Sequence, residues 1–253
     1  MCEYFWFYET ELPPGVGVET FSAFHLTWVT TALAIIVLTI LIYRRRVEAI
    51  RRRIQMSVVF IMVTIQLFSW LWTAISGHYT IQQMLPLHLC TLSVWIEVSA
   101  VISGSTLMKE FSYCCGMPGA VFALLTPVMG EYPFCNYFYM QFSLAHSILI
   151  LLPLLWIFGD GFQPNIRRLP HCFGLLLVFA GIAALTNKLI GSNYMFLRYA
   201  PLNTLLEVFE RWCGTPGYII PLILMVFVVW IILYIPWLVY ESMQGKRGKE
   251  ISL

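Results

Sequence analysis

A few polar side chains interrupt the long apolar stretches of this chain, and their types allow group-transfer or proton chemistry. Cys90 offers a thiol, which reacts as the thiolate and needs a base to take its proton. His88 and His146 offer imidazoles that can accept this proton and return it to a leaving oxygen. Glu97 is either a proton site or a neutral acid bonded to a neighbouring helix. The candidate catalytic residues are Cys90, His146 and His88.

The spacing of these residues limits which of them can act together. Cys90 and Glu97 are seven residues apart, so they share one face of a helix. His88 and Cys90 are two residues apart and point to roughly opposite sides of a regular helix. His88 is therefore a poor direct base for Cys90 unless Pro86 distorts the first turn. His146 or His25, which come from other segments, are better candidates.

A second set of polar residues could hold a substrate. Amide groups and a lysine can stabilise a developing oxyanion or bind a phosphate. Amides in membrane helices also serve as hydrogen-bond partners between helices, and this interpretation stays open. The candidate substrate-binding residues are His25, Gln141, Asn187, Lys188, Asn193, Tyr194 and Glu97.

The composition identifies the medium in which these groups work. The chain has 253 residues, of which 59% are hydrophobic and only 11% charged, whereas soluble domains are about 25% charged. We therefore expect an integral membrane protein that forms one polytopic domain over residues 1–253. The first 20 residues carry no basic n-region, so no cleavable signal peptide is expected.

Seven apolar segments are each close to the roughly 20 residues that a helix needs to cross a bilayer. Helices are expected because lipid offers no water to an open backbone. The predicted fold is an all-α single bundle of seven transmembrane helices. Their approximate ranges are 22–43, 55–76, 85–104, 112–129, 137–158, 171–190 and 217–240.

The distribution of basic residues predicts the orientation. Twelve of the 15 Lys and Arg residues fall on one side of the threaded segments. The positive-inside rule then predicts the N-terminus outside and the C-terminus inside. Residues 1–20 become a non-cytoplasmic segment, 44–54 a basic cytoplasmic loop and 241–253 a cytoplasmic tail. The polar candidates then fall mostly in the non-cytoplasmic half, which predicts a cavity that opens to that face.

Several short motifs together carry a resemblance to a known family. In chain order they are Pro86 to Cys90, Gly116 to Ala120, Ala123 to Pro127, Gln141-Phe142 with His146, Gly191 to Leu197, and Leu233 to Pro236. This order and spacing resemble the YwaF-type integral membrane proteins of bacteria over nearly the whole chain. That family is similar to a vertebrate transmembrane acyltransferase group of ether-phospholipid synthesis.

The resemblance implies a function and a set of partners. It implies a lipid acyltransferase in which Cys90 carries the acyl group as a thioester and a histidine acts as base. Membrane phospholipids are the expected substrates, and a bacterial plasma membrane is the expected location. We expect no cofactor and no nucleic-acid partner, and the oligomeric state is left open.

Two other classes of function remain open. A transporter or receptor would also use a polar pocket among helices, with Glu97 and His146 as proton-coupled groups. A metal site built from His25, His88, Cys90 and His146 is chemically allowed but lacks HExxH or paired CxxC spacing, so no metal is predicted. Cysteines expected on the outer side, where a disulfide is permitted, are Cys2, Cys135 and Cys213.

Overall fold

The computed structural model describes residues 3–202 and 204–250, and all the regular structure in this part of the chain is helical. The long helices are α1 (Ala23–Tyr43), α2 (Glu48–Ile75), α4 (Leu89–Ser103), α7 (Tyr137–Phe158), α8 (Leu169–Ile190) and α10 (Ile219–Glu250). The short ones are α3 (Ile81–Met84), α5 (Thr106–Phe111), α6 (Met117–Leu125) and α9 (Leu205–Cys213), with a π-helical turn η2 (Ser112–Gly116) between α5 and α6. Short 3₁₀ turns are η1 (Glu9–Glu11), η3 (Ile166–Arg168) and η4 (Tyr194–Phe196). Cys2 and residues 251–253 of the expected tail lie outside the described residues.

The all-helical prediction is confirmed, and each of the seven expected segments coincides with helical structure. Five helices among the described residues are long and apolar enough to cross a membrane by length and composition. Their bounds are Ala23–Tyr43, Glu48–Ile75, Tyr137–Phe158, Ile166–Ile190 and Ile219–Met243. The other two segments differ from a single long helix. The third contains α4, a shorter apolar helix of 15 residues, and the fourth, 112–129, contains the π-helical turn η2 and α6 and leaves the helix after Leu125.

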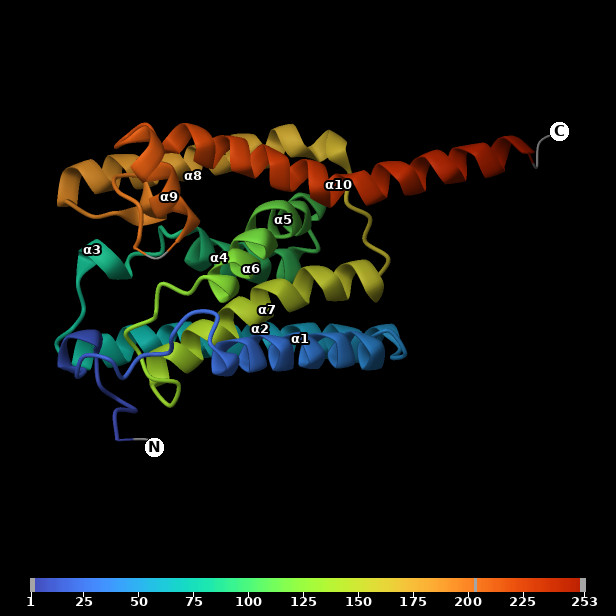
Figure 1. The fold of residues 1–253 in the computed structure, drawn as a ribbon. Coiled ribbons are helices and arrows are strands. Elements are labelled where there is room, and N and C mark those ends of the chain that lie inside the picture. The colour runs from blue at the N-terminus through green and yellow to red at the C-terminus, as the bar shows by residue number, and fades with distance from the viewer. Residues whose placement is uncertain (1–2, 203, 251–253) are drawn as a thin grey trace.

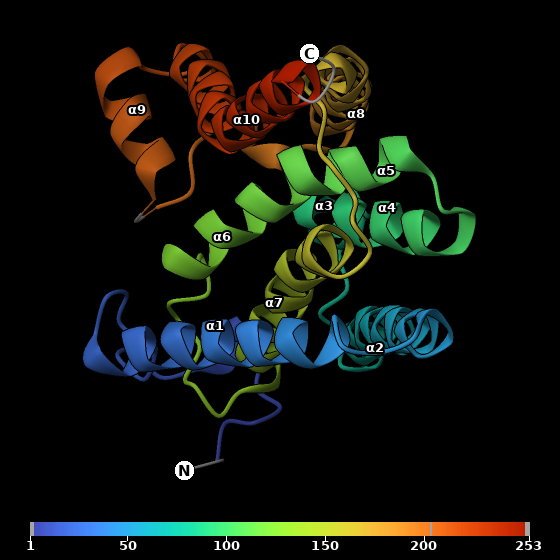
Figure 2. The same ribbon diagram turned by 90° about the vertical axis from the view of Figure 1, so that its right-hand side faces the viewer.

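The helices form three tiers, with α7 near the centre (Figures 1 and 2). One tier holds α1 and α2, the middle tier holds α4, α5 and α6, and the third holds α8 and α10. Half of the most apolar stretch of α7 is buried inside the protein. The corresponding share is 11% or 17% in the other four helices that are long enough to cross a membrane. The central helix therefore packs on protein, whereas the others turn most of their surface outward, as suits lipid.

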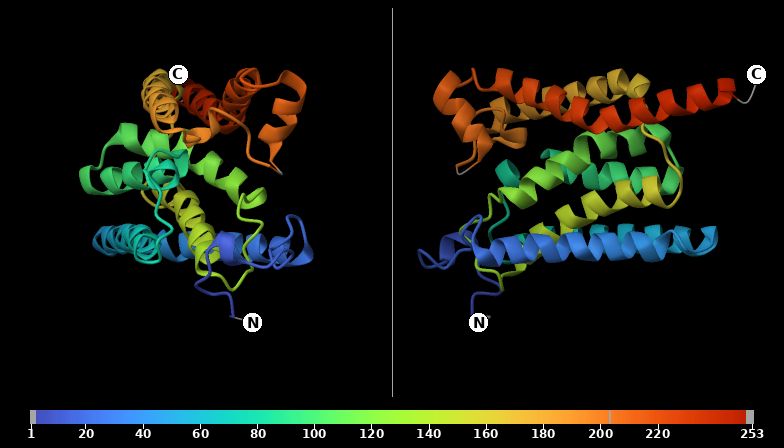
Figure 3. Two further views of the ribbon diagram at one scale, coloured as in Figure 1. Left: turned by 90° about the vertical axis from the view of Figure 1, so that its left-hand side faces the viewer. Right: turned by 45° about the vertical axis from the view of Figure 1, so that its right-hand side comes forward.

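The connections divide between the two ends of the bundle (Figures 1 and 3). One end, here called the long-loop end, contains residues 3–22, 76–88, 126–136 and the 191–218 region apart from residue 203. The connections 44–47, 104–105 and 159–168 lie at the other, here called the arginine end. The far end of α10 projects beyond the arginine end, so the described N- and C-terminal segments lie at opposite ends.

The basic loop expected over 44–54 is shorter than predicted, because α2 already begins at Glu48. Arg51 donates a hydrogen bond to the carbonyl oxygen of Gly159, and Arg52 donates one to that of Val101. These contacts hold the first turn of α2 against two other chain segments. The arginines therefore belong to a helix and connect it to its neighbours.

The third segment begins later than predicted. Residues 85–88 form turns and bends, and α4 starts only at Leu89. Pro86 explains this, because proline disfavours helical backbone in the residue before it and lacks an N–H. At about 1.5 Å per residue, α4 covers about 22 Å and is shorter than the roughly 30 Å hydrocarbon core.

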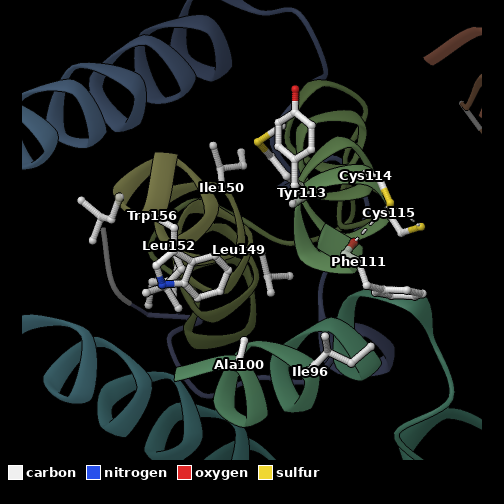
Figure 4. Close-up of a cluster of buried hydrophobic side chains, with 14 of the residues drawn as sticks. Ile96, Ala100, Phe111, Tyr113, Cys114, Cys115, Leu149, Ile150, Leu152 and Trp156 are labelled. Carbon is white, nitrogen blue, oxygen red and sulfur yellow. Dashed lines mark hydrogen bonds between the residues drawn. The ribbon is translucent and has the colours of Figure 1, made fainter. Parts of the chain in front are cut away.

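Apolar side chains from three helical segments fill the centre of the bundle (Figure 4). Leu149, Leu152 and Trp156 of α7 face Ala100 and Ile96 of α4, with the α5 and η2 side chains beside them. Leu152 and Trp156 are fully buried. Fully burying a side chain such as that of Leu152 is worth about 1.5–3 kcal/mol relative to leaving it exposed to water.

A polar cluster joins α1, α2 and α7 at the arginine end. The Tyr43 hydroxyl donates to Asp160, and Gln55 donates to both, at 2.5 Å to Tyr43 and 2.6 Å to Asp160. Arg51 completes the cluster with an ion pair to Asp160 at 3.2 Å. The Tyr43 ring lies against Gly159, where a Cβ would come 2.3 Å from a ring carbon.

The close contact between Gly159 and Tyr43 gives a stability prediction. Gly159→Ala must displace the buried Tyr43 ring, so we expect a loss of about 1–3 kcal/mol in the free energy of unfolding. Gly174→Ala is the matched control, because an added Cβ there meets nothing within 4 Å and alanine favours a helix. Thermal unfolding in detergent should show a lower melting temperature for Gly159→Ala only. Equal melting temperatures would contradict the close packing of Tyr43.

Candidate functional site

A stripe of three polar residues runs along one face of α4. Cys90, Ser93 and Glu97 are spaced by three and four residues, which places them on the same face of the helix. Ser93 and Glu97 are fully buried, and neither the Ser93 hydroxyl nor either Glu97 carboxyl oxygen has a hydrogen-bond partner among the described residues. Unpaired buried polar groups are costly, so a stripe of them indicates function more than packing.

The stripe faces a break in the neighbouring helix. The π-helical turn η2 packs against α4, and a Cβ on Gly116 would lie 3.0 Å from the Ser93 hydroxyl oxygen. The Trp230 indole of α10 donates to the carbonyl oxygen of Cys114 in this turn at 2.9 Å. Single π-helical turns occur frequently at functional sites.

His146 lies on α7, which packs against α4, η2 and α6. Its side chain is 5% exposed, and its Nδ1 lies 2.7 Å from the carbonyl oxygen of Phe142. A carbonyl oxygen only accepts hydrogen bonds, so Nδ1 carries the proton. Nε2 of the neutral ring then holds the lone pair and has no hydrogen-bond partner among the described residues. This tautomer can act as a base through Nε2.

Contacts with α2 set the relative depth of α4 and α7. Arg52 bonds to the carbonyl of Val101 on α4, and Gln55 accepts a hydrogen bond from Trp156 on α7 at 3.3 Å. Arg52 and Gln55 are three residues apart, which is about 4.5 Å along a helix. Val101 and Trp156 therefore lie at similar depths.

Counting from these contacts places Cys90 and His146 at similar depths. Cys90 is eleven residues from Val101 and His146 is ten residues from Trp156, so each lies about 15–17 Å toward the long-loop end. The two residues thus lie within about one helical turn of each other in depth. No hydrogen bond joins Cys90 to His146 or His88 in the described chain, and the Cys90 sulfur lies 4.0 Å from the Thr91 hydroxyl oxygen.

Cys90 belongs to the first turn of α4, whose N-terminus has no side-chain cap. Among the described residues, no oxygen accepts a hydrogen bond from the backbone N–H groups of Leu89, Cys90 or Thr91. Free N–H groups at a helix N-terminus attract negative charge. An oxyanion formed beside the Cys90 sulfur would therefore meet hydrogen-bond donors.

His88 precedes this helix and belongs to a different environment. Its ring lies edge-on to Tyr194, with centroids 5.0 Å apart, and 5.3 Å from the ring of Phe196. His88 is the N-cap residue and has an extended backbone, because α4 has not yet begun. The structure thus places His88 against the 191–199 loop.

Asn187 and Tyr194 fix that loop to the chain segment before α4. The Asn187 amide donates to the Tyr194 carbonyl at 2.9 Å and accepts from the Tyr194 N–H at 2.7 Å and from the Ser192 hydroxyl at 2.8 Å. The Tyr194 hydroxyl donates to the carbonyl of Ile81 and accepts from the N–H of Leu85. Burial raises the pKa of the Tyr194 hydroxyl, so it remains a donor at neutral pH.

The 191–199 loop also stores backbone strain. Met195 and Phe196 have φ values of 54° and 53°, in the left-handed region that residues with side chains rarely adopt. The Asn193 side chain accepts hydrogen bonds from the N–H groups of Arg198 and Tyr199, which helps to hold this shape. Strained backbone of this kind is concentrated at binding and active sites.

Two predicted site residues lie apart from the stripe. His25 accepts from the N–H of Phe21 through Nδ1 and donates through Nε2 to the carbonyl of Leu124 at 2.9 Å, so both ring nitrogens are bonded and Nε2 connects α1 to α6. Gln141 lies about 140° around α7 from His146. It lines an apolar groove of about 390 Å³ between α1 and α7 together with Trp28.

The structure adds residues that the sequence analysis did not select. Ser93 could have been found, because it lies on the helical face that Cys90 and Glu97 define. Arg198 lines a hollow together with Lys188, and no sequence spacing pointed to this pair. Within residues 3–202 and 204–250, no group of three or more His, Cys, Asp and Glu side chains is arranged to hold a metal ion.

The Ser93 hydroxyl, which has no hydrogen-bond partner among the described residues, gives a prediction about stability. Ser93→Ala removes a buried group that has no partner among the described residues. We therefore expect an equal or higher melting temperature, with a gain of up to about 1 kcal/mol in the free energy of unfolding. Asn187→Ala is the contrasting variant, because it removes three hydrogen bonds and should lower the melting temperature. Thermal unfolding in detergent tests both. A clear loss of stability in Ser93→Ala would mean that the hydroxyl has a structural partner.

The comparisons with known proteins place the chain in a family. No curated protein and no solved structure matches it significantly. The TMEM164 family matches residues 20–234, a range that contains the α4 stripe, the π-helical turn, His146 and the 191–199 loop. Membership in this family agrees with the several long apolar helices and indicates a multi-pass membrane protein. The chain belongs to the TMEM164 family.

Proposed function

We propose that this protein is a lipid acyltransferase that carries a fatty acyl group on Cys90 as a thioester. Support comes from one arrangement: a thiol at an uncapped helix N-terminus, within about one helical turn in depth of a neutral histidine whose Nε2 has no partner in the described chain. The resemblance to YwaF-type proteins and to the vertebrate acyltransferase group agrees with this arrangement. The proposed site comprises Cys90, His146, Ser93 and Glu97.

The proposed reaction proceeds in two steps. In the first, His146 Nε2 takes the thiol proton and the Cys90 sulfur attacks an ester carbonyl carbon. The C–S bond forms, the bond to the leaving oxygen breaks, and His146 returns the proton to that oxygen. In the second, the hydroxyl of another lipid gives its proton to His146 and attacks the thioester. The new ester bond forms, the C–S bond of the thioester breaks, and His146 returns the proton to the Cys90 sulfur.

The surroundings of Cys90 support this chemistry. The backbone N–H groups in the first turn of α4, of which those of Cys90 and Thr91 lie beside the Cys90 sulfur, can donate to the oxyanion that forms in each step. A membrane-buried location excludes water, which favours transfer to a lipid hydroxyl over hydrolysis. Hydrogen bonds between catalytic groups are often long before the substrate binds, so the missing bond between Cys90 and His146 is compatible with this role.

The proposal includes the membrane arrangement. Seven spans, formed by α1, α2, α4, the α5–η2–α6 segment, α7, α8 and α10, would place the long-loop end on the non-cytoplasmic side. The arginine-rich end would then face the cytoplasm. Membrane phospholipids would present their acyl esters near the depth of Cys90, and a bacterial plasma membrane is the proposed location.

The covalent intermediate is directly testable. Intact-protein mass spectrometry in native lipid should detect a fatty-acyl adduct that hydroxylamine removes, and Cys90→Ser should lose this adduct and the transfer activity while remaining folded. Cys213→Ser is the matched control, because Cys213 is an exposed free thiol at the same end. His146→Ala should reduce turnover by about a hundredfold to ten-thousandfold, and the double variant should lose little more. Full activity in Cys90→Ser would exclude the thioester mechanism.

The same experiment separates the alternative, a transporter or receptor. The observation that favours it is Glu97, a buried carboxyl without a partner in the described part of the chain, because such residues mark ion and proton pathways. A transporter would form no acyl adduct, and Glu97→Gln would abolish uptake of its ligand into vesicles. A fatty-acyl adduct that depends on Cys90 would support the acyltransferase and exclude the transporter alternative.

The orientation can be tested by labelling. In a background with Cys2, Cys135 and Cys213 changed to serine, a cysteine at Arg46 should add no labelling by an impermeant thiol reagent in intact cells, and a cysteine at Glu207 should add labelling. Permeabilised cells provide the control, because both positions should react there. Labelling at Arg46 alone in intact cells would place the long-loop end in the cytoplasm.

A further inference from the structure

A hollow of about 320 Å³ opens at the long-loop end, where α8 meets the 191–199 loop. Its walls contain two cationic side chains, and both Lys188 and Arg198 are exposed. The remaining wall comes from Ala184, Asn187, Gly191 and Leu197. An anionic group that enters this hollow would meet both positive charges.

The charges at this end make the pair distinctive. Most basic residues of the chain occur at or near the arginine end or in the tail, and the long-loop end carries Lys188, Arg198 and Arg211. Arg211 forms an ion pair with Glu207 at 2.5 Å. In the part of the chain that the structure describes, no carboxylate forms an ion pair with Lys188 or Arg198. The two unpaired cations of this end thus share one hollow.

The loop that presents Arg198 is built from specific hydrogen bonds. Asn193 accepts from the Arg198 N–H at 3.0 Å, and the Arg198 guanidinium donates to the Ser192 carbonyl at 3.2 Å. Gly191 turns the chain with a φ of +74°, and a Cβ there would lie 4.0 Å from the Arg198 guanidinium. The guanidinium is therefore held over the end of α8 and keeps further N–H donors for a ligand.

A chain of contacts leads from the hollow to Cys90. Asn187, which lines the hollow, bonds to Tyr194, and the Tyr194 ring packs against His88. His88 is two residues before Cys90. A ligand anchored in the hollow would therefore begin next to the elements that hold the proposed catalytic thiol.

We infer that Lys188 and Arg198 bind the phosphate group of a phospholipid head group. Arginine matches the geometry of phosphate oxygens and lysine supplies a second point charge. The inference rests on the proposed acyl transfer, because it assigns the head group of the substrate to this hollow and its acyl ester to Cys90. Free inorganic phosphate offers the same chemistry, so the test includes it separately.

Native mass spectrometry of the full chain in detergent provides a binding test that needs no activity. The probes are dioleoylphosphatidylglycerol, dioleoylglycerol, which lacks the phosphate, and inorganic phosphate as a competitor. We expect the phospholipid to bind better than dioleoylglycerol, and a Lys188→Gln/Arg198→Gln double variant to lose about tenfold or more in affinity for the phospholipid alone. Arg211→Gln, which changes the same charge at the same end, should stay within about twofold of the wild type.

Each outcome decides the inference. Equal phospholipid binding in the double variant, or an equal loss in Arg211→Gln, would overturn it. Binding of inorganic phosphate without preference for the phospholipid would overturn the head-group assignment. Arg198→Lys should recover part of the affinity, and melting temperatures check that the variants are folded. Cys90→Ser should bind the phospholipid like the wild type, because the binding test requires no acyl transfer. Failure of head-group binding and failure of acyl transfer can therefore be told apart.

Discussion

Polar groups inside this bundle must find their partners within the protein, because lipid offers them no hydrogen bonds, and most of the architecture follows from this constraint. Helices satisfy their own backbone, and the breaks between them are compensated by specific side chains. Trp230 bonds to the Cys114 carbonyl of the π-helical turn, and Tyr194 bonds to both sides of the short segment before α4. Apolar side chains from the middle of α7 and from α4 form the centre of the bundle.

The two ends of the bundle satisfy this constraint by different means. At the arginine end, charged groups connect distant segments: Arg51 pairs with Asp160, and Arg168 pairs with the fully buried Glu110 at 2.8 Å. At the long-loop end, neutral amides and a tyrosine hold a strained loop. Ion pairs connect distant segments at the first end. The second has the local Arg211–Glu207 pair and leaves Lys188 and Arg198 without an ion-pair partner among the described residues, which agrees with the ligand site proposed there.

The stripe on α4 is the main exception to the satisfied interior. Ser93 and Glu97 are buried without partners among the described residues, while His25 and Asn187, which are comparably buried, have all their main polar atoms bonded. A packing role explains His25 and Asn187, since each connects two parts of the chain. The stripe has no such explanation, and it lies on the same helix face as Cys90. This contrast supports a site between α4, η2 and α7 over one spread through all the polar candidates.

The sequence alone determined the class of fold and the approximate positions of the helical segments. Long apolar runs have few alternatives to helices in lipid, and the relation of Cys90 to Glu97 follows from helical periodicity, which is a local property. Tertiary structure decided what depends on distant contacts. The π-helical turn is tied to α10, the start of α2 is tied to the end of α7, and the loop after α8 brings Arg198 back to Lys188. Such contacts join segments far apart in the chain, so no local pattern of residues could specify them.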